Sequence, residues 1–192
     1  MLDQLINADR ELFLFFNTLG STGWDTFWLV VTNKFTFIPL YALLLFLVYK
    51  KLGAKTVLTL VILAALMIAF TDQISNLFKH GFQRPRPCRQ EGVMEYMRFI
   101  AERCGRYGFF SAHAASTMAV AVCIGLILKP FYKNVIFMLL FWSTVVAYSR
   151  IYVGVHYPLD IVCGMAFGAL TGFGFFKLYL YAMKRQGLPT FY

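Results

Sequence analysis

Long apolar runs separated by short polar segments dominate this chain of 192 residues. The runs cover approximately residues 24–49, 56–78, 113–129, 134–149 and 158–183. An α-helix needs roughly 20 apolar residues to cross the hydrocarbon core of a bilayer, within a range of about 17–25. The pattern therefore predicts an all-α membrane helix bundle with about five transmembrane helices. Because no linker rich in Ser, Pro or Gly divides the chain, residues 1–192 are expected to form one domain.

The N-terminal segment, residues 1–19, differs from these five runs. Its apolar residues are interspersed with Asp3, Asp9, Arg10 and Glu11. This mixture is typical of an amphipathic helix that lies in the membrane interface. A short sixth helix packed on the bundle is the alternative interpretation.

The composition agrees with a membrane protein. Hydrophobic residues make up 59% of the chain and charged residues only 14%, whereas soluble domains carry about 25% charged residues. A net charge of +9 would indicate a nucleic-acid partner in a soluble protein. Here the charge lies at the ends of apolar runs and in one connecting segment, so we expect membrane lipids and no nucleic acid as partners.

The basic residues form two groups. The first flanks the ends of apolar runs, at Lys50, Lys51, Lys55, Lys129, Lys133, Lys184 and Arg185. With five spans these positions share one side of the membrane, which the excess of Lys and Arg assigns to the cytoplasm. The second group lies between two spans, at Lys79, Arg84, Arg86, Arg89, Arg98, Arg103 and Arg106. Segment 79–112 is then an extracytoplasmic loop. Its basic residues indicate an anion site, a lipid-headgroup patch, or both.

Small residues recur at four-residue spacing in the last run, at Gly164, Gly168 and Gly172. Such spacing lets two helices approach closely in lipid. Packing inside the bundle is favoured over a dimer interface, and the oligomeric state is left open.

Four cysteines divide into two pairs. Cys123 and Cys163 lie within spans and are expected to act as small apolar side chains. Cys88 and Cys104 flank one loop and could form a disulfide if that loop faces an oxidising compartment.

The first of three polar clusters is the segment KHGFQRPRP at residues 79–87. Lys79 offers a point charge, and Arg86 offers a planar fork that can bind two phosphate oxygens. Pro85 and Pro87 prevent the helix from continuing. A basic stop segment that anchors lipid headgroups is the alternative interpretation.

The second cluster, GFFSAH at residues 108–113, opens the third apolar run. Ser111 suits a helix N-cap, and the free N–H groups of a helix N-terminus can hold a phosphate. His113 near that end could act as a general acid. Alternatively, this is an ordinary serine cap beside an interfacial histidine.

The third cluster covers residues 149–160. Pro158 suits the first position of a helix, which puts His156 at the helix entrance and Asp160 in the first turn. The carboxylate can hold one imidazole nitrogen and leave the other free to attack, while Arg150 closes a phosphate site. Alternatively, Asp160 only stabilises the helix N-terminus and His156 is incidental.

Together the clusters resemble the type 2 phosphatidic acid phosphatase superfamily, also called lipid phosphate phosphatases. The family pattern is Lys, six residues, then Arg-Pro; next Pro-Ser-Gly-His; then Ser-Arg, five residues, His, three residues, Asp. The first and third elements match in full, at Lys79, Arg86, Pro87, Ser149, Arg150, His156 and Asp160. The resemblance covers roughly residues 55–183.

The second element departs from the family pattern at two positions. Phe110 and Ala112 stand where the family has Pro and Gly, whereas Ser111 and His113 are retained. If the Gly position needs a positive φ, an alanine there would cost on the order of 1 kcal/mol.

The resemblance implies a role for each matched residue. His156 would attack phosphorus and form a phosphohistidine, Asp160 would orient its imidazole, and His113 would protonate the leaving oxygen. The phosphate-binding residues would be Lys79, Arg86, Ser111 and Arg150. Supporting residues would be Ser149, Ala112 and Arg84, of which Arg84 is expected mainly to contact lipid headgroups.

We expect neither a metal nor another cofactor. A two-metal phosphatase needs several carboxylates or histidines that converge, and only Asp160 is clearly available near the site. Asp72, on the helix that precedes Lys79, is expected to pair with a basic residue or to cap packing rather than to bind a metal.

The resemblance implies metal-independent hydrolysis of a lipid phosphate or pyrophosphate. The small size and short loops favour a bacterial cytoplasmic membrane, and the positions of the basic connections put the site on the periplasmic side. Undecaprenyl pyrophosphate and lipid A phosphate are the leading substrates, followed by phosphatidylglycerophosphate and phosphatidic acid. A non-catalytic anion-binding transporter is the main alternative, and a vanadate-dependent oxidase is a third.

Overall fold

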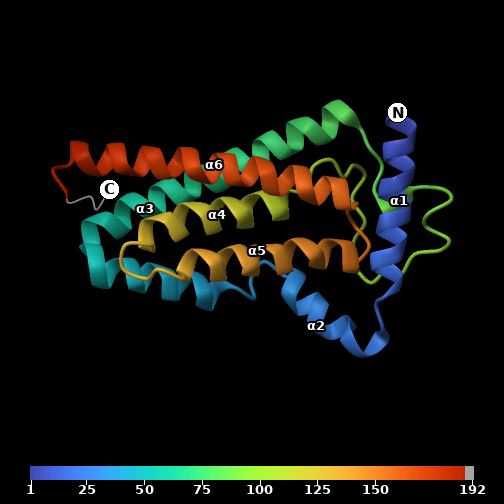
Figure 1. Cartoon of the computed structure of the whole chain (residues 1–192), viewed down its shortest axis with the longest axis horizontal. Helices are drawn as coiled ribbons and strands as arrows, with labels where there is room; N and C mark the ends of the chain where they lie inside the picture. Colours follow the sequence, from blue (N-terminus) through green and yellow to red (C-terminus); the bar gives the residue numbers. More distant parts are fainter. Residues whose placement is uncertain (189–192) are drawn as a thin grey trace.

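Helices account for nearly all regular structure in the computed structural model, which describes residues 1–188 (Figure 1). The elements are α1 (Leu2–Thr18), α2 (Thr22–Thr32), α3 (Ile38–Phe82), the 3₁₀ turn η1 (Pro87–Arg89), α4 (Ala112–Leu128), α5 (Val135–Tyr152) and α6 (Pro158–Arg185). Helices α3 to α6 run alongside one another as a bundle, as the all-α prediction requires.

Helix α3 reverses direction within its length. A helix of 45 residues would be about 67 Å long at 1.5 Å per residue, far longer than a bilayer core is thick. Gly53 has φ 81 and ψ 174, a conformation that glycine adopts without the steric penalty of a Cβ. The chain turns there, so residues 38–52 and 54–82 form two limbs of a hairpin (Figure 1).

The predicted first span, residues 24–49, is wrong in its boundaries. Helix α2 ends at Thr32, and α3 begins only at Ile38. Asn33 explains the break, because its side chain accepts a hydrogen bond from the backbone N–H of Phe35 at 2.9 Å. The Thr36 hydroxyl also donates to the carbonyl of Val30 at 2.6 Å. Such local side-chain bonds compete with the helical ladder and end it.

The apolar helices have the lengths that a membrane requires. Helices α3, α5 and α6 are long and apolar enough to cross a bilayer, and α4 adds 17 apolar residues beside them. Large apolar side chains point outward from the bundle, as Phe141 and Leu170 do at 72% and 75% exposure. With the two limbs of α3 counted separately, five segments cross the bundle, so the protein is a polytopic membrane protein.

Helix α4 occupies the centre of the bundle and packs most closely on α6. A Cβ added to Gly168 would lie 2.2 Å from the carbonyl oxygen of Ala115, and one on Gly172 would lie 2.5 Å from that of Ala119. The glycine stripe of α6 therefore serves packing inside the bundle, as predicted.

The two ends of the bundle differ in their chemistry. The turn at Gly53, the α4–α5 connection and the end of α6 all lie at one end (Figure 1). These are the three places that carry the first group of basic residues. The loop after α3, the N-terminus of α4 and the α5–α6 connection lie at the opposite end. The predicted polar clusters therefore share one end of the bundle.

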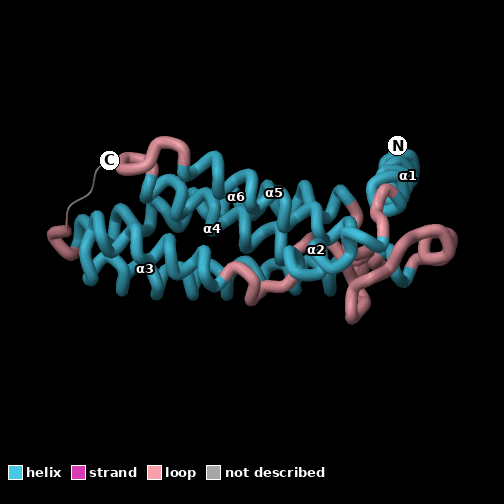
Figure 2. The backbone as a smooth tube through the Cα atoms, turned by 90° about the horizontal axis from the view of Figure 1, so that it is seen from below, coloured by secondary structure: helices cyan, strands magenta, loops and turns pink. Residues whose placement is uncertain are grey.

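Helix α1 lies across that second end, roughly perpendicular to the bundle axis (Figures 1 and 2). Asp9, Phe13 and Asn17 are spaced four residues apart and so share one face of the helix. All three are buried, at 6%, 0% and 0% exposure. Helix α1 therefore packs on the bundle and covers the polar clusters, and its position in the membrane interface stays a prediction.

Candidate active site

The His156–Asp160 pair is formed by the start of α6. Pro158 occupies the first position of α6, preceded by Tyr157 in an extended conformation. Nδ1 of His156 lies 3.3 Å from Oδ2 of Asp160, and the same oxygen accepts the backbone N–H of Tyr157 at 3.1 Å. Both side chains are almost wholly buried. The carboxylate therefore holds one nitrogen of the imidazole, which is the arrangement that the sequence predicts.

Two glycines allow the α3–α4 loop to pack closely around this part of the site. Gly154, in the turn after α5, has φ 85, and a Cβ there would meet the carbonyl oxygen of Arg98 at 2.8 Å. A Cβ on Gly108 would lie 2.9 Å from Oδ2 of Asp160. The backbone of the α3–α4 loop can therefore approach the carboxylate directly.

Three cations surround His156. Burial lowers the pKa of His156 well below its ordinary value, and the positive charges of Arg86, Arg150 and Lys79 lower it further. A neutral imidazole with a free nitrogen can act as a nucleophile. Lys79 and Arg86 come from the first cluster and Arg150 from the third, so the structure brings these two clusters together.

Lys79 lies in the last turn of α3 rather than beyond it, because the helix continues to Phe82. Its ammonium makes one long hydrogen bond, 3.4 Å, to the side chain of Asn76. Asp72, which was expected to pair with a basic residue, instead accepts from Asn76 at 3.5 Å and forms no ion pair within the described chain.

Arg86 follows α3 in the loop that crosses the bundle end. Its Nε donates to the carbonyl of Tyr107 at 3.0 Å, and a terminal nitrogen donates to the carbonyl of Val155 at 3.4 Å. Burial lowers the pKa of this guanidinium from its ordinary value, against the opposing effect of Asp160. The side chain is thus held by neutral acceptors, which leaves its charge available for an anion.

Arg150 sits in the last turn of α5, where one terminal nitrogen donates to the hydroxyl of Thr32. Its Nε is buried and makes no hydrogen bond to any described residue. A buried N–H without a partner is uncommon, and it suits a side chain that receives an anion. Ser149 behaves differently, because its hydroxyl donates to the carbonyl of Val146 at 2.6 Å within the same helix.

The second cluster forms the N-terminus of α4. Ser111 is the N-cap and accepts the N–H of Ala114 at 3.4 Å, and its own N–H donates to the carbonyl of Asp160 at 3.1 Å. His113 lies in the first turn of α4, two residues after this cap. All three predicted clusters therefore meet at one place.

The departures at Phe110 and Ala112 are accommodated. Ala112 begins α4, and Gln83 is the sole non-glycine residue with positive φ among residues 1–188. The conditional strain at Ala112 therefore does not arise. Phe110 is buried against Phe78 and Phe167, at centroid distances of 5.2 and 5.0 Å, and its carbonyl accepts the hydroxyl of Ser75.

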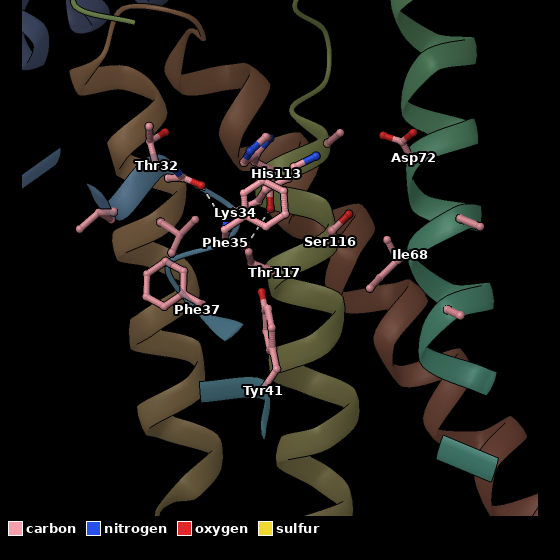
Figure 3. Close-up of a pocket in the computed structure, with 16 residues that line it drawn as sticks. Thr32, Lys34, Phe35, Phe37, Tyr41, Ile68, Asp72, His113, Ser116 and Thr117 are labelled. Carbon is pink, nitrogen blue, oxygen red and sulfur yellow. Dashed lines mark hydrogen bonds between the residues drawn. The ribbon is translucent and has the colours of Figure 1, made fainter. Parts of the chain in front are cut away.

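A cavity of about 670 Å³ leads to His113 from the side of the bundle. Its walls are the α2–α3 linker, α3, and the first turns of α4, with Tyr41 and Ile68 on its apolar sides (Figure 3). Figure 3 shows His113 at one end of this space and Asp72 on α3 across from it. The cavity can hold an apolar chain beside a polar headgroup.

The loop between α3 and α4 is cross-linked by a disulfide between Cys88 and Cys104, with 6.3 Å between their Cα atoms. Cys123 and Cys163 are free, and Cys123 is buried. Arg89, Arg103 and Arg106 of the same loop are exposed.

Arg84 is bound by two carboxylates, although we expected it mainly to contact lipid headgroups. Its two terminal nitrogens bind the carboxylates of Asp160 and Asp9, at 2.8 and 2.6 Å, and its guanidinium lies 4.3 Å from the centre of the Tyr157 ring. Although burial disfavours the charged form, Asp160 and Asp9 raise the pKa of Arg84 above its ordinary value. Both terminal nitrogens of Arg84 are therefore bound within the protein.

Asp9 was missed by the sequence analysis as a member of this region. A charged residue in an amphipathic helix is usually solvated, and nothing in the spacing links it to Arg84. Phe13, one turn later on the same face, is apolar, and this is the nearby sign in the sequence that the face of Asp9 packs against the protein.

No three His, Cys, Asp or Glu side chains within residues 1–188 are grouped so as to hold a metal ion.

A neutral histidine held by a carboxylate, a second histidine and three cations at the end of an apolar bundle define a membrane-embedded phosphatase. A model of the PAP2 superfamily matches residues 58–184, and the chain belongs to that family.

Two relatives match almost the whole chain. A lipid A 4'-phosphatase of Bacteroides thetaiotaomicron is 34% identical over 187 residues, covering 96% of this chain and 81% of the relative. A lipid A 4'-phosphatase of Porphyromonas gingivalis is 32% identical over 188 residues, covering 96% and 78%. The crystal structure of a transmembrane PAP2-type phosphatidylglycerolphosphate phosphatase from Bacillus subtilis superposes with a TM-score of 0.73 at 16% identity, covering 98% of this chain and 90% of that chain. That likeness concerns the fold.

Proposed function

We propose that this protein removes a phosphate group from lipid A at the periplasmic face of the bacterial cytoplasmic membrane. The observation that carries the chemistry is the buried His156–Asp160 pair surrounded by Lys79, Arg86 and Arg150. The choice of lipid A is supported by relatives that are more than 30% identical over nearly the full chain.

His156 acts as the nucleophile in this proposal. A proton on Nδ1, which faces Asp160 at 3.3 Å, leaves the lone pair of Nε2 free to attack phosphorus. As the N–P bond forms, the bond from phosphorus to the lipid oxygen breaks, and the product is a phosphohistidine. Asp160 stabilises the positive charge that the imidazole acquires.

His113 donates a proton to the departing lipid oxygen and then removes one from the water that hydrolyses the phosphohistidine. Lys79, Arg86 and Arg150 bind the phosphoryl oxygens, together with Ser111 and the free N–H groups at the start of α4. Positioning and charge stabilisation provide most of the catalysis of phosphoryl transfer. None of these reaction steps requires a metal ion.

The cavity beside His113 supports a substrate whose apolar part stays in the membrane. Its volume of about 670 Å³ and its apolar lining suit part of an acyl chain or a sugar headgroup with its first methylene groups. The phosphorylated end would then extend from this cavity toward His156.

Two features support a periplasmic site. The basic connections lie at the opposite end of the bundle (Figure 1), where the excess of Lys and Arg is typical of the cytoplasmic side. The disulfide between Cys88 and Cys104 lies in the loop at the site, and disulfides persist in oxidising compartments.

The test is phosphate release by the purified protein in detergent and EDTA. The substrates are lipid A bisphosphate, undecaprenyl pyrophosphate, phosphatidylglycerophosphate and phosphatidic acid. We expect the fastest turnover with lipid A, and mass spectrometry should locate the loss at the 4' position. Faster turnover of another lipid overturns the proposed substrate, and turnover that EDTA abolishes overturns the mechanism.

A non-catalytic anion transporter is distinguished by the same preparation. Quenching the reaction with alkali preserves an acid-labile phosphohistidine, which should carry ³²P from labelled lipid. Absence of label in wild-type protein, together with absence of phosphate release, would favour transport.

A further inference from the structure

We propose that Asp9 of the N-terminal helix is a positioning residue of the active site, acting through Arg84 on Asp160 and so on His156. The inference rests on the proposed function for the roles of His156 and Asp160, and it holds for whichever phosphorylated lipid the protein hydrolyses.

An unbroken chain of contacts links α1 to the imidazole. Oδ2 of Asp9 lies 2.6 Å from one terminal nitrogen of Arg84, whose other terminal nitrogen lies 2.8 Å from Oδ1 of Asp160. The remaining oxygen of Asp160 faces Nδ1 of His156. The planar guanidinium thus joins the two carboxylates with a fixed geometry that an ammonium could not provide.

Both carboxylates are also fixed to the start of α6. Asp9 accepts the N–H of Leu159 through Oδ1 at 2.8 Å, and Asp160 accepts the N–H of Tyr157 at 3.1 Å. These are N–H groups of the helix N-terminus, which lack partners inside the helix. Asp9 therefore accepts a hydrogen bond from an N–H group that has no partner within α6.

The packing of α1 holds Asp9 at this point. Phe13, one turn along the same face, is fully buried and meets the Tyr157 ring edge-on at 5.3 Å. One turn further, the amide of Asn17 donates to the carbonyls of Arg98, Ile151 and Tyr152, each at 3.0 Å. The helix thus contacts the residues on both sides of His156.

Charge gives Asp9 a second effect. Arg84 alone would neutralise Asp160 and weaken its influence on the imidazole. With Asp9 also bound, the group contains two carboxylates and one guanidinium. Its net charge is −1 when all three side chains are ionised. That charge favours the positive imidazolium-like nitrogen of a phosphohistidine. Removing the Asp9 carboxylate should therefore slow the chemical step rather than weaken phosphate binding.

The experiment is a double-mutant cycle on turnover, with Asp9→Asn, Arg84→Gln and the double variant. We expect Asp9→Asn to lower kcat by about 10- to 100-fold, by analogy with the loss when a hydrogen-bond partner of a metal-ligating side chain is removed, with KM within about twofold of wild type. The double variant should be no slower than Arg84→Gln alone, because Asp9 acts through Arg84. Asp3→Asn, at an exposed position of the same helix, is the matched control and should behave as wild type.

Two results would overturn the proposal: an Asp9→Asn kcat within twofold of wild type, or a double variant whose loss equals the product of the single losses. Thermal unfolding in the same detergent shows whether each variant is folded. Should Asp9→Asn fail to fold, Arg84→Lys provides the test, since it keeps the charge and loses the two-armed geometry; an unchanged kcat would then refute the inference. The cycle uses whichever lipid the wild type hydrolyses, so a wrong substrate in the panel is distinguishable from a wrong role for Asp9.

Discussion

His156 and Asp160 are four residues apart, yet they belong to different structural elements. Nδ1 of His156, in the connection after α5, lies 3.3 Å from Oδ2 of Asp160, in the first turn of α6. Pro158 begins the helix between them. The turn of the helix brings the carboxylate back toward the imidazole, so that a short sequence motif provides both the nucleophile and the group that orients it.

Replacement of His156 by Ala should abolish turnover, because no other described histidine contacts Asp160, and the guanidinium of Arg84, which does, cannot act as a nucleophile. The expected loss in kcat is at least about 10³-fold, by comparison with other enzymes that lose a nucleophile. His80→Ala is the matched control, since His80 is exposed on the last turn of α3 and should leave kcat unchanged. Phosphate release measures both, and equal losses in the two variants would contradict the assignment.

Acid should destabilise the protein through His156. Burial lowers the pKa of His156 well below its ordinary value of about 6.5. Below pH 6.5 the unfolded chain therefore binds a proton that the folded chain does not. The free energy of unfolding then falls with decreasing pH, by at most about 1.4 kcal/mol per pH unit from this group.

The measurement is the unfolding midpoint in detergent between pH 7.5 and pH 5, for wild type and His156→Gln. The variant should lose less stability than wild type over this range, because Gln does not titrate. Parallel curves would show that His156 has the same pKa in both states.

The disulfide should stabilise the loop at the site. It closes a loop with a sequence separation of 16 residues, and chain-entropy arguments give about 3 kcal/mol for a loop of this length. A reducing agent should lower the unfolding temperature of wild type, and Cys88→Ser should show the lower value without reductant. Cys163→Ser, at a free cysteine, is the control; a reductant effect that persists in Cys88→Ser would contradict the prediction.

Two glycines of α6 should differ sharply in their tolerance of alanine. A Cβ on Gly168 would lie 2.2 Å from the carbonyl oxygen of Ala115, whereas one on Gly174 would have nothing within 4 Å. We expect Gly168→Ala to lower the free energy of unfolding by about 1–3 kcal/mol, as overpacking of a core does. Gly174→Ala should leave the free energy of unfolding unchanged or raise it slightly. Thermal unfolding distinguishes the two; equal midpoints would mean that α4 and α6 can separate without cost.

The helical membrane class and the site motifs were readable from residue order alone. Apolar runs of membrane-spanning length have few other stable arrangements in lipid, and the third cluster is local, since Asp160 reaches His156 within one turn. The number of spans also predicted that the basic residues of the connections lie together at one end of the bundle. The break at Asn33 was missed, because the surrounding residues are apolar and the competing hydrogen bonds are local details.

The partners of isolated charged residues were decided by the tertiary structure alone. Arg84 and Asp9 are 75 residues apart, and no periodicity relates them. The sequence therefore suggested lipid headgroups for Arg84 and, for Asp9, only a place among the charged residues of an amphipathic helix. A buried charge needs an opposite charge or a set of hydrogen bonds, but that partner can come from any element that the fold brings near. Residue order therefore determined the spans and the chemistry of the clusters, whereas the docking of α1 over the bundle end brought Asp9 to Arg84 as a second carboxylate beside Asp160.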